Sequence, residues 1–212
     1  FVFMLGSAIS FIFTLISVDN AIAFLPKEQV DAILDSDVYG ARESWDNSVM
    51  SSFILTNNIR VGIISFVLGI TMGVGTSWVL LVNGYMLGGF AALYFHKGAN
   101  LLFWSLILPH GVIELLAIFI CGGAGIIVGY SLINPLSYSR KDSLIIRGKT
   151  ALKLVLGTIP MFIIAGIIEG NITPSDKISE AGKLVFALFT LLLFAVYIIV
   201  PNMKYRLKDK IL

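Results

Sequence analysis

Charged residues and cysteine are scarce in this sequence. Only 13% of its 212 residues are charged and 57% are hydrophobic, whereas soluble domains have about 25% charged and about 45–50% apolar residues. The single cysteine, Cys121, excludes an intramolecular disulfide and a cysteine-based zinc site. The net charge of +2, without a basic patch that carries aromatic residues, argues against nucleic acid as a partner. The composition is typical of a polytopic membrane protein.

Long apolar runs predict an all-α protein with about six transmembrane helices. The first run extends from Phe1 to about Leu25, which is long enough for one crossing of about 20 residues. The run 59–95 would reach roughly 55 Å as a helix, slightly less than two crossings of about 30 Å each. It therefore holds two short or tilted helices, with the turn either at Gly73-Val74-Gly75-Thr76 or at Asn83-Gly84. Further crossings are expected within residues 101–133, 150–168 and 184–200.

The polar segments predict one transmembrane domain, residues 1–212, with a defined orientation. Segment 27–58 holds two basic and six acidic residues, which gives 2 − 6 = −4, whereas loop 134–149 and tail 201–212 are basic. Cytoplasmic loops are enriched in Lys and Arg, so we expect 134–149 and 201–212 in the cytoplasm and 27–58 outside the cell. Six crossings then place both termini in the cytoplasm, as in a multi-pass protein of the cell membrane.

Two short amphipathic helices are predicted within the acidic segment. In the first, Val30, Ile33 and Leu34 share one helical face. In the second, the apolar residues recur at spacing i, i+4, i+8 and are Trp45, Val49 and Phe53. Such helices lie on the membrane surface with the apolar face inward. Their acidic faces would point outward, either as a docking surface for an extracytoplasmic partner or as a solvated cap without one.

The sequence Pro109-His110-Gly111, followed by Glu114, interrupts an otherwise apolar run. Proline and glycine predict a broken or re-entrant helix at this point. An ionisable residue inside a membrane segment marks a functional site by default. His110 and Glu114 are spaced i, i+4 on the small-residue face of their helix, so both side chains are expected to point into protein.

Two interpretations of this pair stay open. In the first, His110 and Glu114 form a metal, proton or ion site. A metal needs three or four ligands, so Glu169 is the best third candidate, and zinc is a candidate ion. In the second, the pair has a structural role. His110 and Glu114 form hydrogen bonds with the backbone groups that Pro109 leaves without a partner, because buried polar groups must be bonded. The spacing differs from the His-Glu-x-x-His motif of zinc proteases, and no other catalytic arrangement is present, so we do not expect an enzyme.

The remaining polar and small residues predict helix contacts. Asn83 is expected to form an interhelical hydrogen bond, and Arg60 is expected to anchor the outer end of its helix. Glycines four residues apart predict close helix packing or a homodimer. These pairs are Gly69/Gly73, Gly84/Gly88, Gly125/Gly129 and Gly166/Gly170.

Four stretches, taken in order, resemble a known family. They are Asn57-Asn58-Ile59-Arg60, Asn83-Gly84 with Leu87-Gly88, Pro109-His110-Gly111 with Glu114, and Ile168-Glu169-Gly170 with Thr173-Pro174. Over about residues 57–174 the sequence is similar to the stage II sporulation protein M family of bacterial integral membrane proteins. The resemblance implies a scaffold that recruits the peptidoglycan-degrading engulfment machinery, with stage II sporulation proteins D and P, to the septal membrane. Those partners carry the hydrolysis, so the family implies no catalytic residue here.

The alternative function is a transporter or an ion-binding membrane protein. Broken apolar segments near mid-membrane are how transporter sites are built. His110, Glu114 and Glu169 would line such a site, together with Asn83. The two functions differ in whether the three ionisable side chains converge within the distances that a bound ion requires.

Overall fold

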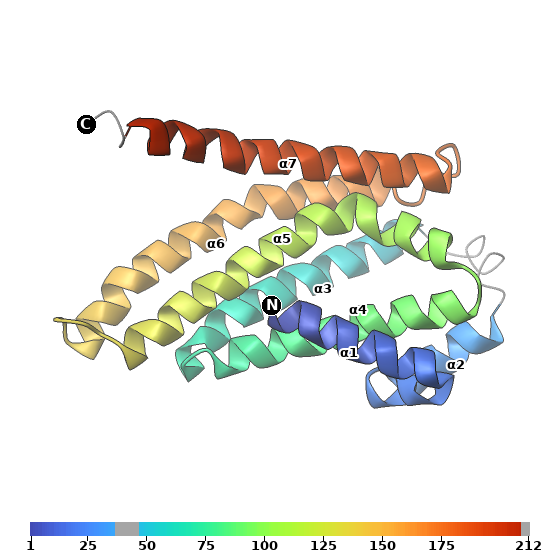
Figure 1. Cartoon of the computed structure of the whole chain (residues 1–212), viewed down its shortest axis with the longest axis horizontal. Coiled ribbons are helices and arrows are strands. Elements are labelled where there is room, and N and C mark those ends of the chain that lie inside the picture. Colours follow the sequence, from blue (N-terminus) through green and yellow to red (C-terminus); the bar gives the residue numbers. More distant parts are fainter. Residues whose placement is uncertain (37–46, 209–212) are drawn as a thin grey trace.

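A computed structural model describes residues 1–36 and 47–208 of the chain, and every regular element in these two ranges is helical (Figure 1). The result confirms the prediction of an all-α polytopic membrane protein. The elements are α1 (Val2–Ile16), the 3-10 helix η1 (Val18–Ala23), α2 (Lys27–Asp35), α3 (Asn47–Val67), the 3-10 helix η3 (Leu68–Thr71), α4 (Val74–His96), α5 (Asn100–Ile133), α6 (Arg140–Asn171) and α7 (Glu180–Lys208).

Helices α3 to α7 are each long and apolar enough to cross a membrane, whereas α1 has 15 residues. The expectation of one continuous span from Phe1 to Leu25 was therefore wrong. Helix α1 ends at Ile16 because Ser17 adopts an extended conformation. Its last turn is held from outside the helix, since Asn20 Nδ2 donates to the Phe13 carbonyl at 2.9 Å and His96 Nε2 lies 3.0 Å from the Thr14 carbonyl.

The turn between α3 and α4 lies at the first of the two predicted places. Gly73 has φ +85°, in the left-handed region that glycine adopts without steric cost. Thr76, at the start of α4, donates through Oγ1 to the Ser65 carbonyl at 2.6 Å and ties the two helices together. Asn83-Gly84 lies inside α4.

Helix crossings in this bundle are close where glycines face a neighbouring backbone. A Cβ atom on Gly84 or Gly88 would collide with the carbonyl groups of Phe3 and Ser7, so α1 and α4 run parallel in direct backbone contact. The same holds for Gly125 on α5, which faces the Ser65 carbonyl of α3. These contacts confirm the close packing predicted from the glycine pairs. A Cβ atom on Gly170 would meet no atom within 4 Å. The predicted homodimer stays a prediction.

Helix α5 is continuous through Pro109, which corrects the expectation of a broken or re-entrant segment. Proline lacks the N–H that would bond to the carbonyl four residues earlier, and such a loss bends a helix. Figure 1 shows α5 changing direction in its N-terminal part. The helix continues on both sides because Pro109, His110 and Gly111 are buried among neighbouring elements, whose packing holds the chain in place.

The apolar face of α2 is covered by protein, not by lipid as the sequence suggested. Val30 is buried in a cluster with Ala21, Leu25 and Leu93, and the other two apolar side chains of α2 pack against that cluster. Lys97 Nζ donates to the Leu34 carbonyl at 2.7 Å, at the C-terminal end of the helix. Of the three residues that define the second predicted amphipathic helix, Trp45 lies outside the described residues. Trp45 precedes α3, and Val49 and Phe53 lie in its first turns.

The two basic segments lie at one end of the bundle. Helix α6 begins at Arg140, so only part of loop 134–149 is irregular, and α7 continues to Lys208. Figure 1 shows the α5–α6 connection and the C-terminal end of α7 at the same end, with α2 and the α4–α5 connection at the other. The arrangement agrees with a common side of the membrane for both basic segments.

Candidate functional site

His110 lies between two carboxylates in the interior of the bundle. Its Nδ1 is 2.5 Å from Glu169 Oε2 on α6, and its Nε2 is 3.9 Å from Glu114 Oε2 one turn further along α5. The exposed fractions of His110, Glu114 and Glu169 are 4%, 3% and 6%. The structure therefore brings together the three ionisable residues that the sequence singled out, and it joins α5 to α6 through them.

Two polar side chains from other segments complete the contacts of this group. Asn58 of α3 donates through Nδ2 to Glu114 Oε2 at 2.6 Å. Thr173 follows the end of α6, and its Oγ1 lies 3.2 Å from His110 Nδ1. Thr173 is positioned because its N–H bonds back to the Ile168 carbonyl at 3.1 Å, a bond that closes the last turn of α6 just before Pro174.

Lys183 was not predicted from the sequence as a site residue, and Asn58 and Thr173 were named only within the family motifs. The Lys183 side chain is fully buried, and its Nζ donates to the Thr173 carbonyl at 2.5 Å. It lies in the first turn of α7, where Ser179 accepts a hydrogen bond from the Gly182 N–H at the helix start. A sequence signal did exist, because Lys183, Ala187 and Thr190 form the small and polar face of an otherwise bulky apolar helix.

We call these residues the polar network: Asn58, His110, Glu114, Glu169, Thr173 and Lys183. It joins α3, α5 and α6 with the start of α7 and holds two carboxylates, an imidazole and an ammonium group. A buried charge is costly unless other groups pair with it and bond to it. The members compensate one another in this way, so removal of any one leaves the rest insufficiently compensated.

The polar network lies toward the end of the bundle opposite the basic segments, and the expectation of a site at mid-membrane stays a prediction. Glu169 and Lys149 are 169 − 149 = 20 residues apart on α6, which corresponds to about 30 Å of helix, the thickness of a hydrocarbon core. Lys149 belongs to the basic end of the bundle, so Glu169 lies about one hydrocarbon thickness away from that end along the helix. Lys183 is likewise in the first turn of its helix. Glu114 lies about one turn deeper than His110.

The metal site stays a prediction. The two ring nitrogens of His110 each face a different carboxylate, so the imidazole bridges Glu114 and Glu169, and the three groups do not surround a common point. Within residues 1–36 and 47–208, no three His, Cys, Asp or Glu side chains are arranged to hold a metal ion.

The other predicted site residues have separate positions. Pro109 and Gly111 are buried on either side of His110. Asn83 Nδ2 donates to the Val79 carbonyl of its own helix at 2.8 Å, so this hydrogen bond lies within α4 and is not the interhelical one that was expected. Arg60 is exposed on α3, as an anchoring residue would be.

Comparison with known proteins places the chain in a family. The family description "Stage II sporulation protein M" matches residues 1–174, which include five of the six members of the polar network and exclude Lys183. The chain is 34% identical over 131 residues to uncharacterized protein MJ0706 of Methanocaldococcus jannaschii, covering 60% of this chain and 58% of that protein.

A second relative from the same organism extends this likeness. The chain is 31% identical over 171 residues to uncharacterized protein MJ0793, covering 79% of this chain and 89% of the relative. No solved structure matches the chain. The match over residues 1–174 covers all the motifs that resemble the family. The chain is therefore a member of the stage II sporulation protein M family.

Proposed function

We propose that the protein is a non-enzymatic scaffold of the cell membrane. As a member of its family, it would recruit the peptidoglycan-degrading engulfment machinery, with stage II sporulation proteins D and P, to the septal membrane. The proposal includes an orientation with loop 134–149 and the C-terminal tail in the cytoplasm, because both are basic. The acidic segment 27–58 then faces the compartment in which peptidoglycan lies.

The proposal rests on the acidic face of α2, because this helix is fixed to the bundle by its opposite face. Glu28, Asp31 and Asp35 are exposed at spacing i, i+3, i+7, so they share one side of the helix. The opposite side is fixed to the bundle through Val30, and Lys97 holds the last turn. A fixed row of carboxylates on a short helix can dock a basic surface without the entropic cost of ordering a loop.

Charge reversal on α2 tests this docking surface. The full chain, with an affinity tag, is expressed in a spore-forming bacterium that lacks its own family member. We expect the wild-type protein to capture proteins D and P from membranes, and Asp31→Lys with Asp35→Lys to reduce that capture about tenfold or more, because like charges at an interface cost several kcal/mol. The captured amounts are measured by quantitative mass spectrometry.

The control is Asp19→Lys, which reverses an exposed acidic residue in η1, outside the acidic face of α2. This variant should capture both partners as the wild type does. Asp37, another acidic residue of segment 27–58, lies outside the described residues. Unchanged capture by the α2 variant would remove α2 as the docking surface. A wild-type protein that captures neither partner would contradict the scaffold itself.

An ion-binding function is the alternative, and the buried charges of the polar network favour it. We expect no stoichiometric divalent metal in the purified wild-type protein, because each ring nitrogen of His110 already faces a carboxylate. Elemental mass spectrometry of wild type, His110→Ala and Glu114→Gln measures this. A stoichiometric metal in the wild type, lost in both variants, would replace the scaffold proposal with metal-dependent function. Loss of partner capture in Glu114→Gln without loss of stability would also make Glu114 functional.

A further inference from the structure

Three exposed lysines lie in the N-terminal part of α6. Lys141, Lys149 and Lys153 are separated by eight and four residues, which places them on the same side of the helix, and all three are exposed. The same side also exposes apolar side chains, with exposed fractions of 46% for Ile145 and 53% for Leu156. We call this surface the basic stripe. It is cationic at the helix start and becomes apolar further along.

The depth of the basic stripe in the membrane follows from the helix length. Lys149 lies about 30 Å along α6 from Glu169, so it marks the second boundary of the hydrocarbon core. Lys141 is about two turns beyond this boundary, and Lys153 is about one turn inside it, from where a lysine extends its ammonium group to the interface.

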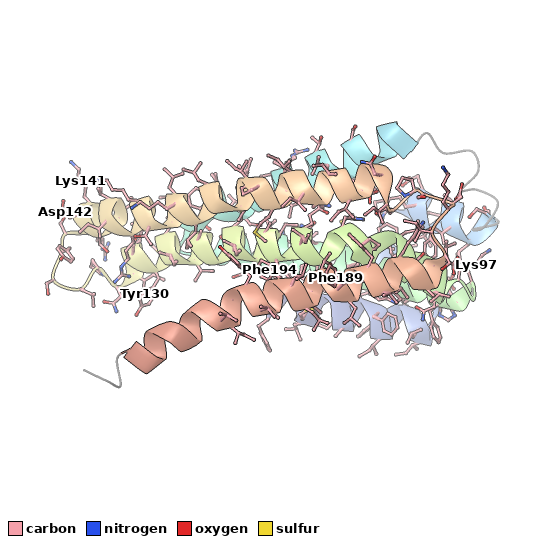
Figure 2. All side chains as sticks on the ribbon, turned by 90° about the horizontal axis from the view of Figure 1, so that it is seen from above. Lys97, Tyr130, Lys141, Asp142, Phe189 and Phe194 are labelled. Carbon is pink, nitrogen blue, oxygen red and sulfur yellow. The ribbon has the colours of Figure 1, made fainter. Side chains whose placement is uncertain are left out.

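An aromatic residue marks the same level on the neighbouring helix. Tyr130 of α5 is half exposed, and the Arg147 guanidinium lies over its ring at 5.3 Å from the centroid. Figure 2 shows Tyr130 and Lys141 at one end of the bundle and Lys97 at the other. Tyrosine is enriched at membrane interfaces, which agrees with the depth derived from α6.

The positive charge of the stripe has little compensation from nearby acidic residues. Asp142 is the single acidic residue between positions 134 and 153. Its carboxylate accepts a hydrogen bond from Ser139 Oγ at 2.6 Å, and its N–H donates to the same Oγ at 3.1 Å, so it serves the start of α6. The stripe therefore presents three cations to the headgroup region, above apolar side chains that face the acyl chains.

We infer that the basic stripe binds the phosphate groups of anionic phospholipids, with the acyl chains packed along Leu152 and Leu156. Lysines next to a membrane helix attract anionic headgroups because the leaflet surface is negatively charged. A nucleic acid would not explain the apolar side chains between the cations. The partner is therefore a lipid that carries a phosphate with net negative charge, and a zwitterionic lipid of the same chain length should bind less tightly.

Spin-labelled lipids test the inference with the full chain in vesicles. Labelled phosphatidylglycerol and phosphatidylcholine of equal chain length are compared for the fraction immobilised at the protein surface, by electron paramagnetic resonance. We expect the wild type to prefer phosphatidylglycerol. The variant with Lys141, Lys149 and Lys153 all changed to Gln should lose most of that preference, at about fivefold in affinity for each lysine removed. The preference of the wild type should also fall as salt is raised.

The matched control removes the same net charge from exposed positions outside the stripe, with Lys27, Arg60 and Lys177 changed to Gln. This variant should keep the wild-type preference. An equal loss in both variants would show a general effect of net charge and overturn the inference, as would an unchanged preference in the stripe variant. Equal thermal unfolding of the three proteins confirms that the comparison is made between folded molecules.

Discussion

Replacing Lys183 with Met is expected to lower the free energy of unfolding by about 3 kcal/mol. Methionine fills a similar volume, so the cost comes from the lost charge and not from a cavity. The Thr173 carbonyl would lose the donor at 2.5 Å, and the polar network would lose its lysine, whose side chain is fully buried. Reversible unfolding in detergent, followed by the circular dichroism of the helices, measures the change.

Two further variants isolate the cause of this effect. Lys177→Met changes an exposed lysine in the connection between α6 and α7. This variant should change the free energy of unfolding by no more than about 0.5 kcal/mol. Glu169→Gln removes one carboxylate, and the double variant with Lys183→Met should cost less than the sum of the two single changes, because groups in one network are coupled. Additive losses, or a Lys183→Met protein as stable as wild type, would mean that Lys183 is not part of the network.

Replacing Gly88 with Val is expected to separate α1 from α4 and to cost about 3 kcal/mol or more, because overpacking here meets backbone and not a movable side chain. The nearest atoms to a Cβ at this position belong to the backbone of Ser7. Neither helix can yield locally, so one must shift along its length. Thermal unfolding measures the loss, and hydrogen exchange measures whether α1 becomes less protected.

Gly157→Val is the matched control, since it makes the same substitution in α6. A Cβ at Gly157 meets no atom within 4 Å, so the variant should be close to wild type in stability and in the exchange of α1. If Gly88→Val were as stable as Gly157→Val, the close crossing of α1 and α4 would be contradicted.

The sequence predicted well those properties that depend on a short stretch of residues. Helical membrane architecture follows from local composition and length, and the pairing of His110 with Glu114 follows from a spacing of four on one helix. Glu169, the predicted third metal ligand, lies beside His110 for a related reason, and the metal site itself stays a prediction. A carboxylate at the end of an apolar run must find a buried partner or reach water, and few other ionisable groups were available within the spans.

The predictions that were wrong or incomplete concern the places where helices pack on one another. Pro109 predicts a break, yet α5 continues because surrounding elements bury the bend. The apolar face of α2 suits lipid as well as protein, and the sequence pattern does not distinguish the two coverings. Glycine pairs predict close contact without naming the partner, which for Gly84 and Gly88 is α1 of the same chain.

By itself, the sequence determined that this is a helical membrane protein with ionisable residues that must be compensated inside it. Only the tertiary structure decided how they are compensated. Asn58 is 56 residues from Glu114 in the chain, and Lys183 lies on a helix outside the residues that the family matches. Contacts over such separations depend on which helix faces align, a property of the packed bundle that no local spacing encodes.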